Sequence, residues 1–443
     1  MTTVANDAAV DSAAGETPLT LYAAAMLVLC IFVGATEGYD VQAMALAAPL
    51  IHSSWHLDFQ HIGLLIAVSS IGQVLGSFLL SPIGDSRGRR PAILLGLLIA
   101  AIGTGSGALA PGFLWLAATR LLAGIGLGLA LPNVLAMAME LAPRRLHALA
   151  VVLVMCGYPL GGAVGAAAAS TVTPSYGHAA VFILGGGCTA LSLLLCLLAL
   201  PESPSFLARK PAQAGELSAL LARLGRSTPP QIPQEKGVQV DGPAARVAAM
   251  FAPERRRGTV FLWLMNLGNV ALVYFFFSWL PSLIVARGLD ASAALRANSL
   301  FSAAGAIGAL IMALNLRRLG SIRVLTAAYA IATAATLTLA FHAGTGELFY
   351  LIIAVAGFSI VGSQFCLSAV VAQFYPATIR ATASGFASGV GRAGAILTPI
   401  VAGAFIGAAG GGQAFLIAAA PAAIALIAAL GLELSGDMRR NAA

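Results

Sequence analysis

Apolar segments of about twenty residues recur along the chain from Leu19 to Leu434, separated by short polar or Pro/Gly-containing stretches. A helix needs about 20 apolar residues to cross a lipid bilayer. The sequence therefore predicts an all-α integral membrane protein with twelve transmembrane helices, in two pseudo-symmetric bundles of six. The expected spans are 19–47, 60–84, 91–110, 114–141, 147–171, 178–200, 258–285, 296–316, 322–343, 348–372, 380–408 and 413–434.

Composition agrees with a membrane location and excludes two classes of protein. Apolar residues make up 59% of the chain and charged residues only 9%, where a soluble domain carries about 25% charge. So few polar side chains cannot cover a soluble fold of this size, which excludes a soluble enzyme. The net charge of +7 is spread between the apolar segments and is not gathered on one domain, so no nucleic-acid partner is expected.

One long polar stretch, residues 202–257, divides the chain into two halves. We interpret it as a cytoplasmic linker between a six-helix bundle at 19–201 and a second at 258–434, with tails at 1–18 and 435–443. The halves resemble each other at an offset of 232 residues, which pairs Asp85 with Arg317 and Gly88 with Gly320. Two similar six-helix halves are how one large class of transporters builds a central cavity.

Basic residues in the short loops predict the orientation, because cytoplasmic loops carry an excess of Lys and Arg. An even number of spans also requires both termini to lie on one side. The nine arginines on that side outnumber the two on the other, Arg287 and Arg296, so both termini and the linker are predicted to be cytoplasmic. The nine are Arg87, Arg89, Arg90, Arg144, Arg145, Arg317, Arg318, Arg323 and Arg380.

Away from the outermost residues of each predicted span, five charged residues remain: Glu37, Asp40, Arg120, Glu140 and Arg392. A charge at the centre of a bilayer costs at least about 2.5 to 3.5 kcal/mol, so such groups usually face a wet cavity and pair with one another. The alternatives are structural ion pairs or side chains that reach the interface. We favour function for Glu37, Asp40 and Arg392, and leave both interpretations open for Glu140.

The types of these residues suit an organic anion and protons. Glu37 and Asp40 are three positions apart and so share a helix face, where a carboxyl group can load and release a proton. Arg120 and Arg392 keep their charge and can hold a carboxylate by two parallel hydrogen bonds. Further polar candidates for substrate binding, each of which could instead join helices, are Gln42, Asn133, Asn266, Asn269, Tyr274 and Gln364, of which we assign Asn133, Asn269, Tyr274 and Gln364 to the site.

Nothing in the sequence indicates a metal ion or another cofactor. The five cysteines lie in apolar segments without ligand spacing. Three glycine motifs, 124–128, 161–165 and 385–389, are not followed by Lys-Ser/Thr, so we expect them to let helices approach closely and not to bind nucleotides.

The segment Gly84-Asp-Ser-Arg-Gly-Arg-Arg90 resembles the cytoplasmic motif of the major facilitator superfamily, although Ser81 and Ser86 stand where that motif has Gly and a basic residue. The resemblance implies a gating role for the motif. Asp85 would reach a neighbouring helix end while Arg89 and Arg90, after the turn at Gly88, bond carbonyl oxygens and latch the two halves together.

Further segments are similar to the aromatic acid:proton symporter family of that superfamily. They are Glu37-Gly-Tyr-Asp40, Arg120-Leu-Leu-Ala-Gly with Pro132-Asn133 and Glu140, Pro201-Glu-Ser-Pro204, Phe277-Ser-Trp-Leu-Pro281, Tyr375-Pro-Ala-Thr-Ile-Arg380 and Gly389-Val-Gly-Arg392. The family's usual Asp-Gly-x-Asp begins with Glu here, as in hydroxyphenylpropionate transporters.

This resemblance implies a monomeric, multi-pass importer of benzoate-like or phenylpropionate-like acids in a bacterial inner membrane. The importer would be driven by protons and would carry no cofactor. Glu37 and Asp40 would couple protons and orient substrate, and Arg120, Glu140, Arg380 and Arg392 would be essential charges. Because Arg380 begins a span at its cytoplasmic end, we assign it, with Glu140, to gating.

Two other functions compete with this hypothesis. Gly157-Tyr-Pro-Leu-Gly-Gly162 faintly resembles the kinked motif of efflux antiporters, with its Pro displaced by one position. Two arginines in the cavity argue against export of cationic compounds. A membrane receptor would need a signalling domain, which the linker and the short tails do not offer.

Overall fold

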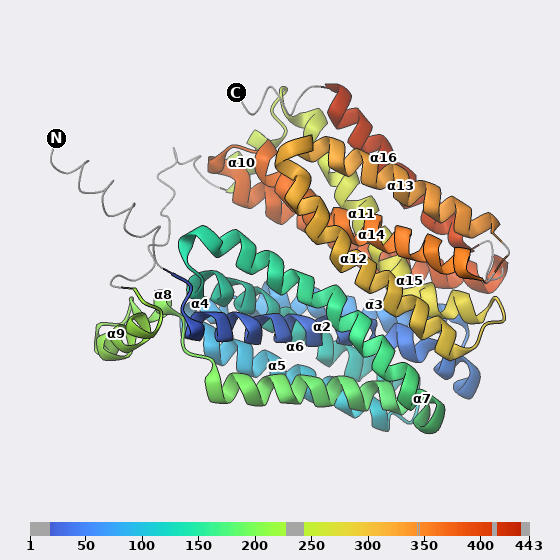
Figure 1. Cartoon of the computed structure of the whole chain (residues 1–443), viewed down its shortest axis with the longest axis horizontal. Coiled ribbons are helices and arrows are strands. Elements are labelled where there is room, and N and C mark those ends of the chain that lie inside the picture. Colours follow the sequence, from blue (N-terminus) through green and yellow to red (C-terminus); the bar gives the residue numbers. More distant parts are fainter. Residues whose placement is uncertain (1–17, 227–242, 343, 345, 410–413, 436–443) are drawn as a thin grey trace. The chain divides into compact units, whose positions relative to one another are not determined.

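The computed structural model describes residues 18–226, 243–342, 344, 346–409 and 414–435. Within these ranges every regular element is helical and no strand occurs, which confirms the predicted all-α class (Figure 1). The long helices are α2 (Leu21–Trp55), α3 (Phe59–Leu75), α5 (Arg89–Ser106), α6 (Phe113–Leu141), α7 (His147–Ala199), α11 (Arg256–Val285), α12 (Ala291–Leu319), α13 (Ser321–Phe341), α14 (Glu347–Phe374), α15 (Ala377–Ala409) and α16 (Ala414–Ser435).

Eleven stretches of the described chain are long and apolar enough to cross a membrane. One of them holds two predicted spans, because α7 contains a kink at Gly177, where φ is 62° and ψ is −155°. An L-residue with a side chain rarely adopts this conformation, so a glycine is suited to the turn. Counted on either side of the kink, the helices give the twelve spans that the sequence predicts.

Two helices extend beyond the ends predicted for their spans. The fifth span was expected to end at residue 171, but its helix continues to Gly177, and the hydroxyl of Thr173 bonds back to the carbonyl of Ala169. The first span was expected to end at residue 47, but α2 continues through Pro49 to Trp55. Backbone hydrogen bonds set where a helix ends, whereas apolar length sets where it crosses a bilayer, so the two boundaries need not coincide.

The described chain forms two compact units. Of the residues described, unit 1 comprises 18–40, 71–161 and 182–226, and unit 2 comprises 41–70, 162–181 and the described residues from 243 to 435. Helices α2, α3 and α7 therefore pass from one unit into the other. The boundaries at 201 and 258 between two bundles and a linker stay a prediction. The linker range itself contains short helices: α8 (Pro204–Leu207), α9 (Ala214–Arg223) and α10 (Pro243–Met250).

Small residues bring the helices of unit 1 close together. A methyl group placed on Gly126 of α6 would lie 2.5 Å from the backbone nitrogen of Ala100 on α5, and one on Gly161 of α7 would lie 1.8 Å from the carbonyl oxygen of Ala35 on α2. Both contacts are too short for any side chain. The packing role expected for the first two glycine motifs is thus confirmed.

The third glycine motif, at 385–389, does not pack in this way. A methyl group on Gly385 or Gly389 would meet no atom of the described residues within 4 Å. Within unit 2 the motif has no such contact among the described residues, and the expectation of close packing stays a prediction.

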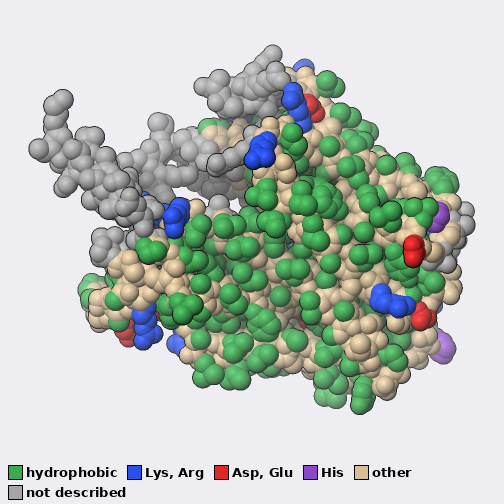
Figure 2. Space-filling view, in the orientation of Figure 1, with side chains coloured by type: hydrophobic (Ala, Val, Ile, Leu, Met, Phe, Trp, Pro, Cys, Tyr) green, Lys and Arg blue, Asp and Glu red, His purple; other side chains and the backbone are tan. Residues whose placement is uncertain are grey.

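Apolar side chains cover much of the exterior. Exposed residues include Leu114, Leu198, Leu314 and Phe341, each at least 70% exposed. Figure 2 shows hydrophobic side chains over most of the visible face, with few charged groups among them. In water such a surface would aggregate, whereas in a bilayer it contacts lipid chains.

Candidate functional site

An ion pair between Asp40 of α2 and Arg120 of α6 lies in the interior of unit 1. Asp40 Oδ1 is 3.5 Å from Arg120 Nη1, and neither side chain is exposed at all. The hydroxyl of Thr104 on α5 also donates to Asp40 Oδ1. Two residues that sequence analysis assigned to different tasks, proton coupling and substrate binding, are therefore direct partners.

The surroundings of Arg120 explain how a guanidinium is held inside an apolar bundle. Its Nη2 donates to the carbonyl of Gly103 at 3.4 Å, and its Cζ lies 4.9 Å from the centre of the Phe182 ring. An aromatic face attracts a cation, and more strongly where water is absent. Packed between these groups, Arg120 is oriented toward Asp40.

The pair does not use all of its hydrogen-bonding capacity. Asp40 Oδ2 and the Nε and Nη1 atoms of Arg120 have no hydrogen-bond partner among the described residues. Removing one member of a buried pair costs about 3 to 5 kcal/mol, because the other charge is left uncompensated. An incompletely bonded pair is correspondingly sensitive to any change in the charge of Asp40.

Glu37 lies one helical turn before Asp40 and has a different partner. Its carboxylate is 2% exposed and accepts a hydrogen bond of 2.7 Å from the side-chain amide of Gln73, at the end of α3 that lies in unit 1. The two acids therefore contact different helices, and the face that their spacing predicts they share stays a prediction. Gln73 was not identified from the sequence, where a lone amide in an apolar segment gives little signal.

The remaining residues predicted to bind substrate, apart from Asn133, lie in unit 2. Asn269 of α11 is fully buried and donates to Ser363 Oγ at 2.7 Å and to the carbonyl of Ile360 at 3.4 Å, both on α14. Tyr274 and Gln364 are half-buried. Asn269 therefore joins two helices, which leaves only its unbonded Oδ1 to interact with another group.

Arg392 of α15 differs from Arg120 in both exposure and partners. It is half-buried, and no described residue forms a hydrogen bond or an ion pair with it. A guanidinium cannot lose its charge in a protein, so a partly buried one needs water or a carboxylate nearby. Within unit 2, Arg392 is a cation available to an anionic ligand.

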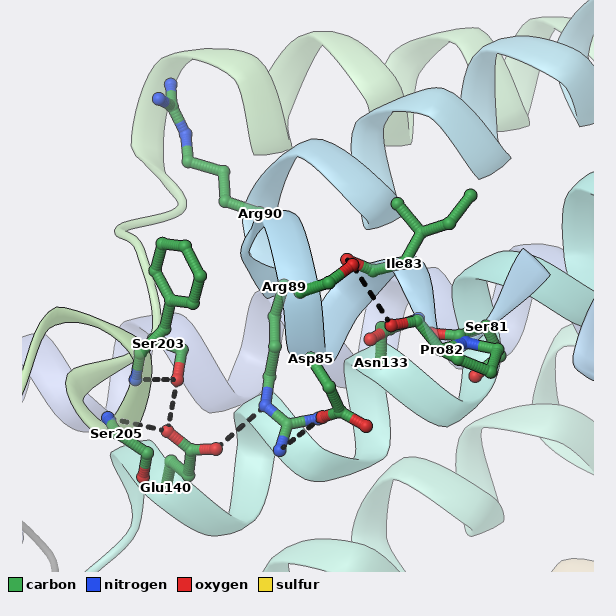
Figure 3. A network of polar contacts seen from close by, with 12 residues as sticks. Ser81, Pro82, Ile83, Asp85, Arg89, Arg90, Asn133, Glu140, Ser203 and Ser205 are labelled. Atoms are coloured by element: carbon green, nitrogen blue, oxygen red, sulfur yellow. Dashed lines mark hydrogen bonds and ion pairs between the residues drawn. The ribbon is translucent and has the colours of Figure 1, made fainter. Parts of the chain in front are cut away.

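Three of the predicted gating residues, Asp85, Arg89 and Glu140, form a connected network in unit 1 (Figure 3). Arg89, at the start of α5, donates through Nε to Glu140 Oε1 of α6 at 2.8 Å, and its Nη2 lies 3.7 Å from Asp85 Oδ1. The other oxygen of Glu140 accepts from the hydroxyl of Ser203 and from the backbone N–H of Ser205. Glu140 is therefore a shared acceptor within this network.

Glu202 is a member of this region that sequence reasoning missed. Its Oε1 accepts from the backbone N–H groups of Arg89, Arg90 and Ser203, at 2.9, 3.1 and 2.7 Å. It thereby satisfies free donors at the N-terminus of α5, where negative charge is favoured. The available signal is the Pro201–Pro204 motif, whose resemblance to a family does not indicate this contact.

Arg226, also missed, holds the other end of this region. Its guanidinium donates to the carbonyls of Glu140, Leu141 and Ala142, which end α6. Burial lowers the pKa of Arg226 from its usual value, yet a cation at a helix C-terminus remains favourable. The first part of the linker range is thus bonded to the ends of α5 and α6.

Three other predicted residues have separate positions. Asn133 donates to the carbonyls of Leu129 at 2.9 Å and of Ser81 at 3.3 Å, so it lies beside the Gly84–Arg90 motif. Arg90 donates to the carbonyl of Leu197 near the end of α7 at 2.8 Å. Arg380 belongs to α15, but its side chain lies outside the described part of the structure.

Comparison with known proteins identifies the family. A family model described as Major Facilitator Superfamily matches residues 29–391. The chain is 29% identical to the 4-hydroxybenzoate transporter PcaK of Acinetobacter baylyi, over 89% of this chain and 86% of that protein. It is 31% identical to the gallate transporter of Pseudomonas putida, over 88% and 87%. It is also 31% identical to the 3-(3-hydroxy-phenyl)propionate transporter of Escherichia coli, over 89% of each.

Solved structures agree at the level of the fold. A bacterial homologue of the human lysosomal transporter Spinster, in an inward-facing and occupied conformation, aligns with a TM-score of 0.73 at 15% identity, covering 95% of this chain and 97% of that one. The Escherichia coli xylose transporter XylE aligns with a TM-score of 0.71 at 14% identity, covering 92% and 98%. The helical architecture, the cytoplasmic motif and the family match agree: the chain belongs to the major facilitator superfamily.

Proposed function

We propose that this protein is a proton-coupled symporter that imports a small aromatic carboxylic acid. Relatives of about 30% identity that align over most of both chains are named as transporters of 4-hydroxybenzoate, gallate and 3-(3-hydroxy-phenyl)propionate. These compounds share an aromatic ring, a carboxylate and at least one hydroxyl group. A substrate of this class combines an anionic end with an apolar face.

The observation that carries proton coupling is the fully buried pair of Asp40 and Arg120. A proton that reaches Asp40 cancels its charge and removes the attraction of the carboxylate for Arg120. Because Arg120 cannot give up its own charge, the two protonation states of Asp40 leave the centre of unit 1 with different net charge and different bonding. Each state then favours a different arrangement of α2 against α6, which is what coupling requires.

The cation that we assign to the substrate carboxylate is Arg392. Arg120 already has a partner and is not exposed, whereas Arg392 is half-buried and has no partner among the described residues. Asn269, Tyr274 and Gln364 supply polar groups in the same unit, and we assign them to the ring and its hydroxyl groups. Glu37, held by Gln73, is assigned with Asp40 to proton coupling.

The network around Glu140 is assigned to gating on the cytoplasmic side, with Asp85, Gly88, Arg89, Arg90 and Arg380. This proposal includes the orientation that the loop arginines indicate, with both termini in the cytoplasm of a bacterial cell and the protein in the inner membrane. Asn133 lies beside this network, so we assign it to gating instead of substrate binding. We propose that the monomer is the working unit.

The test is uptake of labelled 4-hydroxybenzoate by proteoliposomes in sodium-free buffer. An imposed pH gradient, acidic outside, should drive accumulation that a protonophore abolishes. Asp40→Asn should lose accumulation but keep exchange of labelled for unlabelled substrate, while Asp58→Asn, at an exposed loop acid, should behave as wild type. Undiminished accumulation with the protonophore would refute symport, and extrusion of the acid against an inward proton gradient would instead indicate an exporter.

A further inference from the structure

A second buried polar cluster, in unit 2, has no part in the mechanism described so far. The amide of Gln42 on α2 and that of Asn298 on α12 are both fully buried, and Asn298 Nδ2 donates to Gln42 Oε1 at 2.6 Å. Ser302 Oγ, one turn further along α12, lies 3.5 Å from the same oxygen. The cluster connects two helices that are more than 250 residues apart in the sequence.

α7 joins the same contact through its backbone. A methyl group on Gly162 would lie 1.9 Å from Gln42 Nε2, so the absence of a side chain there is what lets the amide fit. The hydroxyl of Ser299 on α12 donates to the carbonyl of Ala163 on α7. Parts of α2, α7 and α12 are therefore held together by polar groups within one compact unit.

The cluster is only partly satisfied. Gln42 Nε2 and Asn298 Oδ1 have no hydrogen-bond partner among the described residues. A buried donor or acceptor without a partner is unfavourable, and water can pair with it once the site opens. Such a contact can hold helices together, yet it costs less free energy to break than a fully bonded network or an apolar core.

Its position on α2 connects it to the ion pair. Gln42 is two residues after Asp40, and two residues of an α-helix turn the direction of the side chain by about 200°. Asp40 accordingly faces α5 and α6 in unit 1, and Gln42 faces α7 and α12 in unit 2. Because α2 is one continuous helix across this point, a movement of Asp40 is transmitted to Gln42.

We infer that the Gln42–Asn298 contact closes the outer side of the transport path and is broken each time that side opens. This inference rests on the orientation given under the proposed function, in which the part of α2 that follows Asp40 is nearer the outside. It does not depend on the identity of the transported acid or on proton coupling. The strength of the contact then sets the balance between closed and outward-open states.

The partly satisfied cluster makes an unusual prediction, in which single and double substitutions act in opposite directions. Asn298→Leu or Gln42→Leu removes the 2.6 Å bond between the two amides and leaves the remaining buried amide with more unpaired atoms in the closed state, so the outward-open population should rise. The double variant removes both amides and their unpaired atoms, so the closed state should be favoured beyond wild type. We expect each change to be about tenfold.

The readout is the labelling of a cysteine that closure hides. Ala163→Cys, buried beside Ser299, is placed in a protein whose five native cysteines are replaced, and whole cells are treated with a membrane-impermeant maleimide. Labelling should be faster in each single variant and slower in the double variant. Asn315→Leu is the matched control, because Asn315 is half-buried on the same helix and, among the described residues, its amide donates to the carbonyl of Ile311 of that helix and not to another helix.

The inference is overturned if the double variant labels as fast as the single ones, or if both single variants label at the wild-type rate. The same labelling in inside-out vesicles, which expose the opposite face to the maleimide, tests the orientation of the protein separately. The same order of rates seen only in such vesicles would support the contact while refuting the proposed orientation. No transport assay is involved, so failure of the proposed substrate or of proton coupling would leave the labelling pattern unchanged.

Discussion

The guanidinium of Arg89 lies between two carboxylates of very different exposure. Its Nε bonds Glu140, whose side chain is 12% exposed, at 2.8 Å, and its Nη2 lies 3.7 Å from Asp85, whose side chain is 70% exposed. Exposed ion pairs contribute little because water screens them, whereas a largely buried carboxylate with several donors contributes more. The two acids of the gating network are therefore unequal.

The first prediction follows from this inequality. Asp85→Asn should slow transport by about two- to fivefold, as expected for loss of a weak exposed pair, and Glu140→Gln should slow it by more than tenfold, since hydrogen bonds to charged groups are worth about 1.5 to 3 kcal/mol. Substrate affinity should change little in either variant. The measurement is initial uptake rate together with equilibrium binding to the purified protein. Equal weakening of binding and transport by Asp85→Asn would remove it from gating.

The second prediction concerns three glycines at helix starts. Gly88 has a φ of 109°, and a methyl group there would lie 2.3 Å from Glu202 Oε2. Gly320 has a φ of 86° but open space around it, and Gly112 is extended with open space as well. Strained backbone costs about 1 to 3 kcal/mol for a residue with a side chain. Alanine should therefore lower thermal stability most at Gly88, less at Gly320 and hardly at all at Gly112.

Apparent melting temperatures of the three variants in one detergent give this comparison directly. Because Glu202 also bonds the N–H groups of Arg89 and Arg90, Gly88→Ala should in addition reduce the transport rate. A Gly88→Ala protein as stable as Gly320→Ala would mean that Glu202 moves aside freely, and that its contact with α5 does not constrain the turn.

The pairing of Gly88 with Gly320 also shows what sequence reasoning can reach. Both glycines end one helix and begin the next in similar backbone conformations, with ψ values of 148° and 132°. The offset between the halves predicted that the two glycines are equivalent, because a turn that requires glycine can be recognised in the sequence. Long apolar segments likewise predicted the helices, since the bilayer fixes the length and polarity of a span.

The partners of the buried charges were not predictable in the same way. The spacing of Glu37 and Asp40 indicated a shared face, but which helix each acid contacts depends on the rotation and packing of α2, which the sequence pattern does not specify. Glu202 and Arg226 were missed because charges in a polar stretch are usually solvated. Only their contacts with the ends of α5 and α6 distinguish them from other charges of the linker.

The third prediction compares single and double removal of the ion pair. Asp40→Asn leaves a guanidinium that cannot become neutral, whereas Arg120→Gln leaves a carboxyl group that can take up a proton. Asp40→Asn should therefore destabilise the protein more, within the range of about 3 to 5 kcal/mol known for broken buried pairs. The double variant should be more stable than Asp40→Asn alone, although it should not accumulate substrate.

Thermal melting of the purified variants measures the order of their stabilities. Exchange of labelled for unlabelled substrate is normalised to the amount of folded protein. The informative result is the recovery of stability in the double variant. If Asp40→Asn and the double variant melted at the same temperature, another group would compensate the charge of Arg120. The Asp40–Arg120 pair would then not be the element that responds to protonation.

The fourth prediction concerns Arg392, which has no partner among the described residues and which we assign to the substrate carboxylate. Lysine keeps the positive charge but lacks the planar fork that bonds a carboxylate twice, so Arg392→Lys should weaken binding of 4-hydroxybenzoate by about tenfold. Arg392→Ala should weaken it further. The protein itself should remain as stable as wild type, because no ion pair is broken.

The decisive comparison changes the ligand together with the protein. Replacing the carboxylate of 4-hydroxybenzoate by an uncharged amide should sharply lower affinity for wild type, since the amide gives up the charge-assisted bonds to Arg392. Arg392→Ala should discriminate far less between acid and amide, because the group that senses the charge is gone. Equal discrimination by both proteins would assign Arg392 to a structural role and move the carboxylate to Arg120. In that case Arg120→Gln, and not Arg392→Ala, would abolish the preference for the acid.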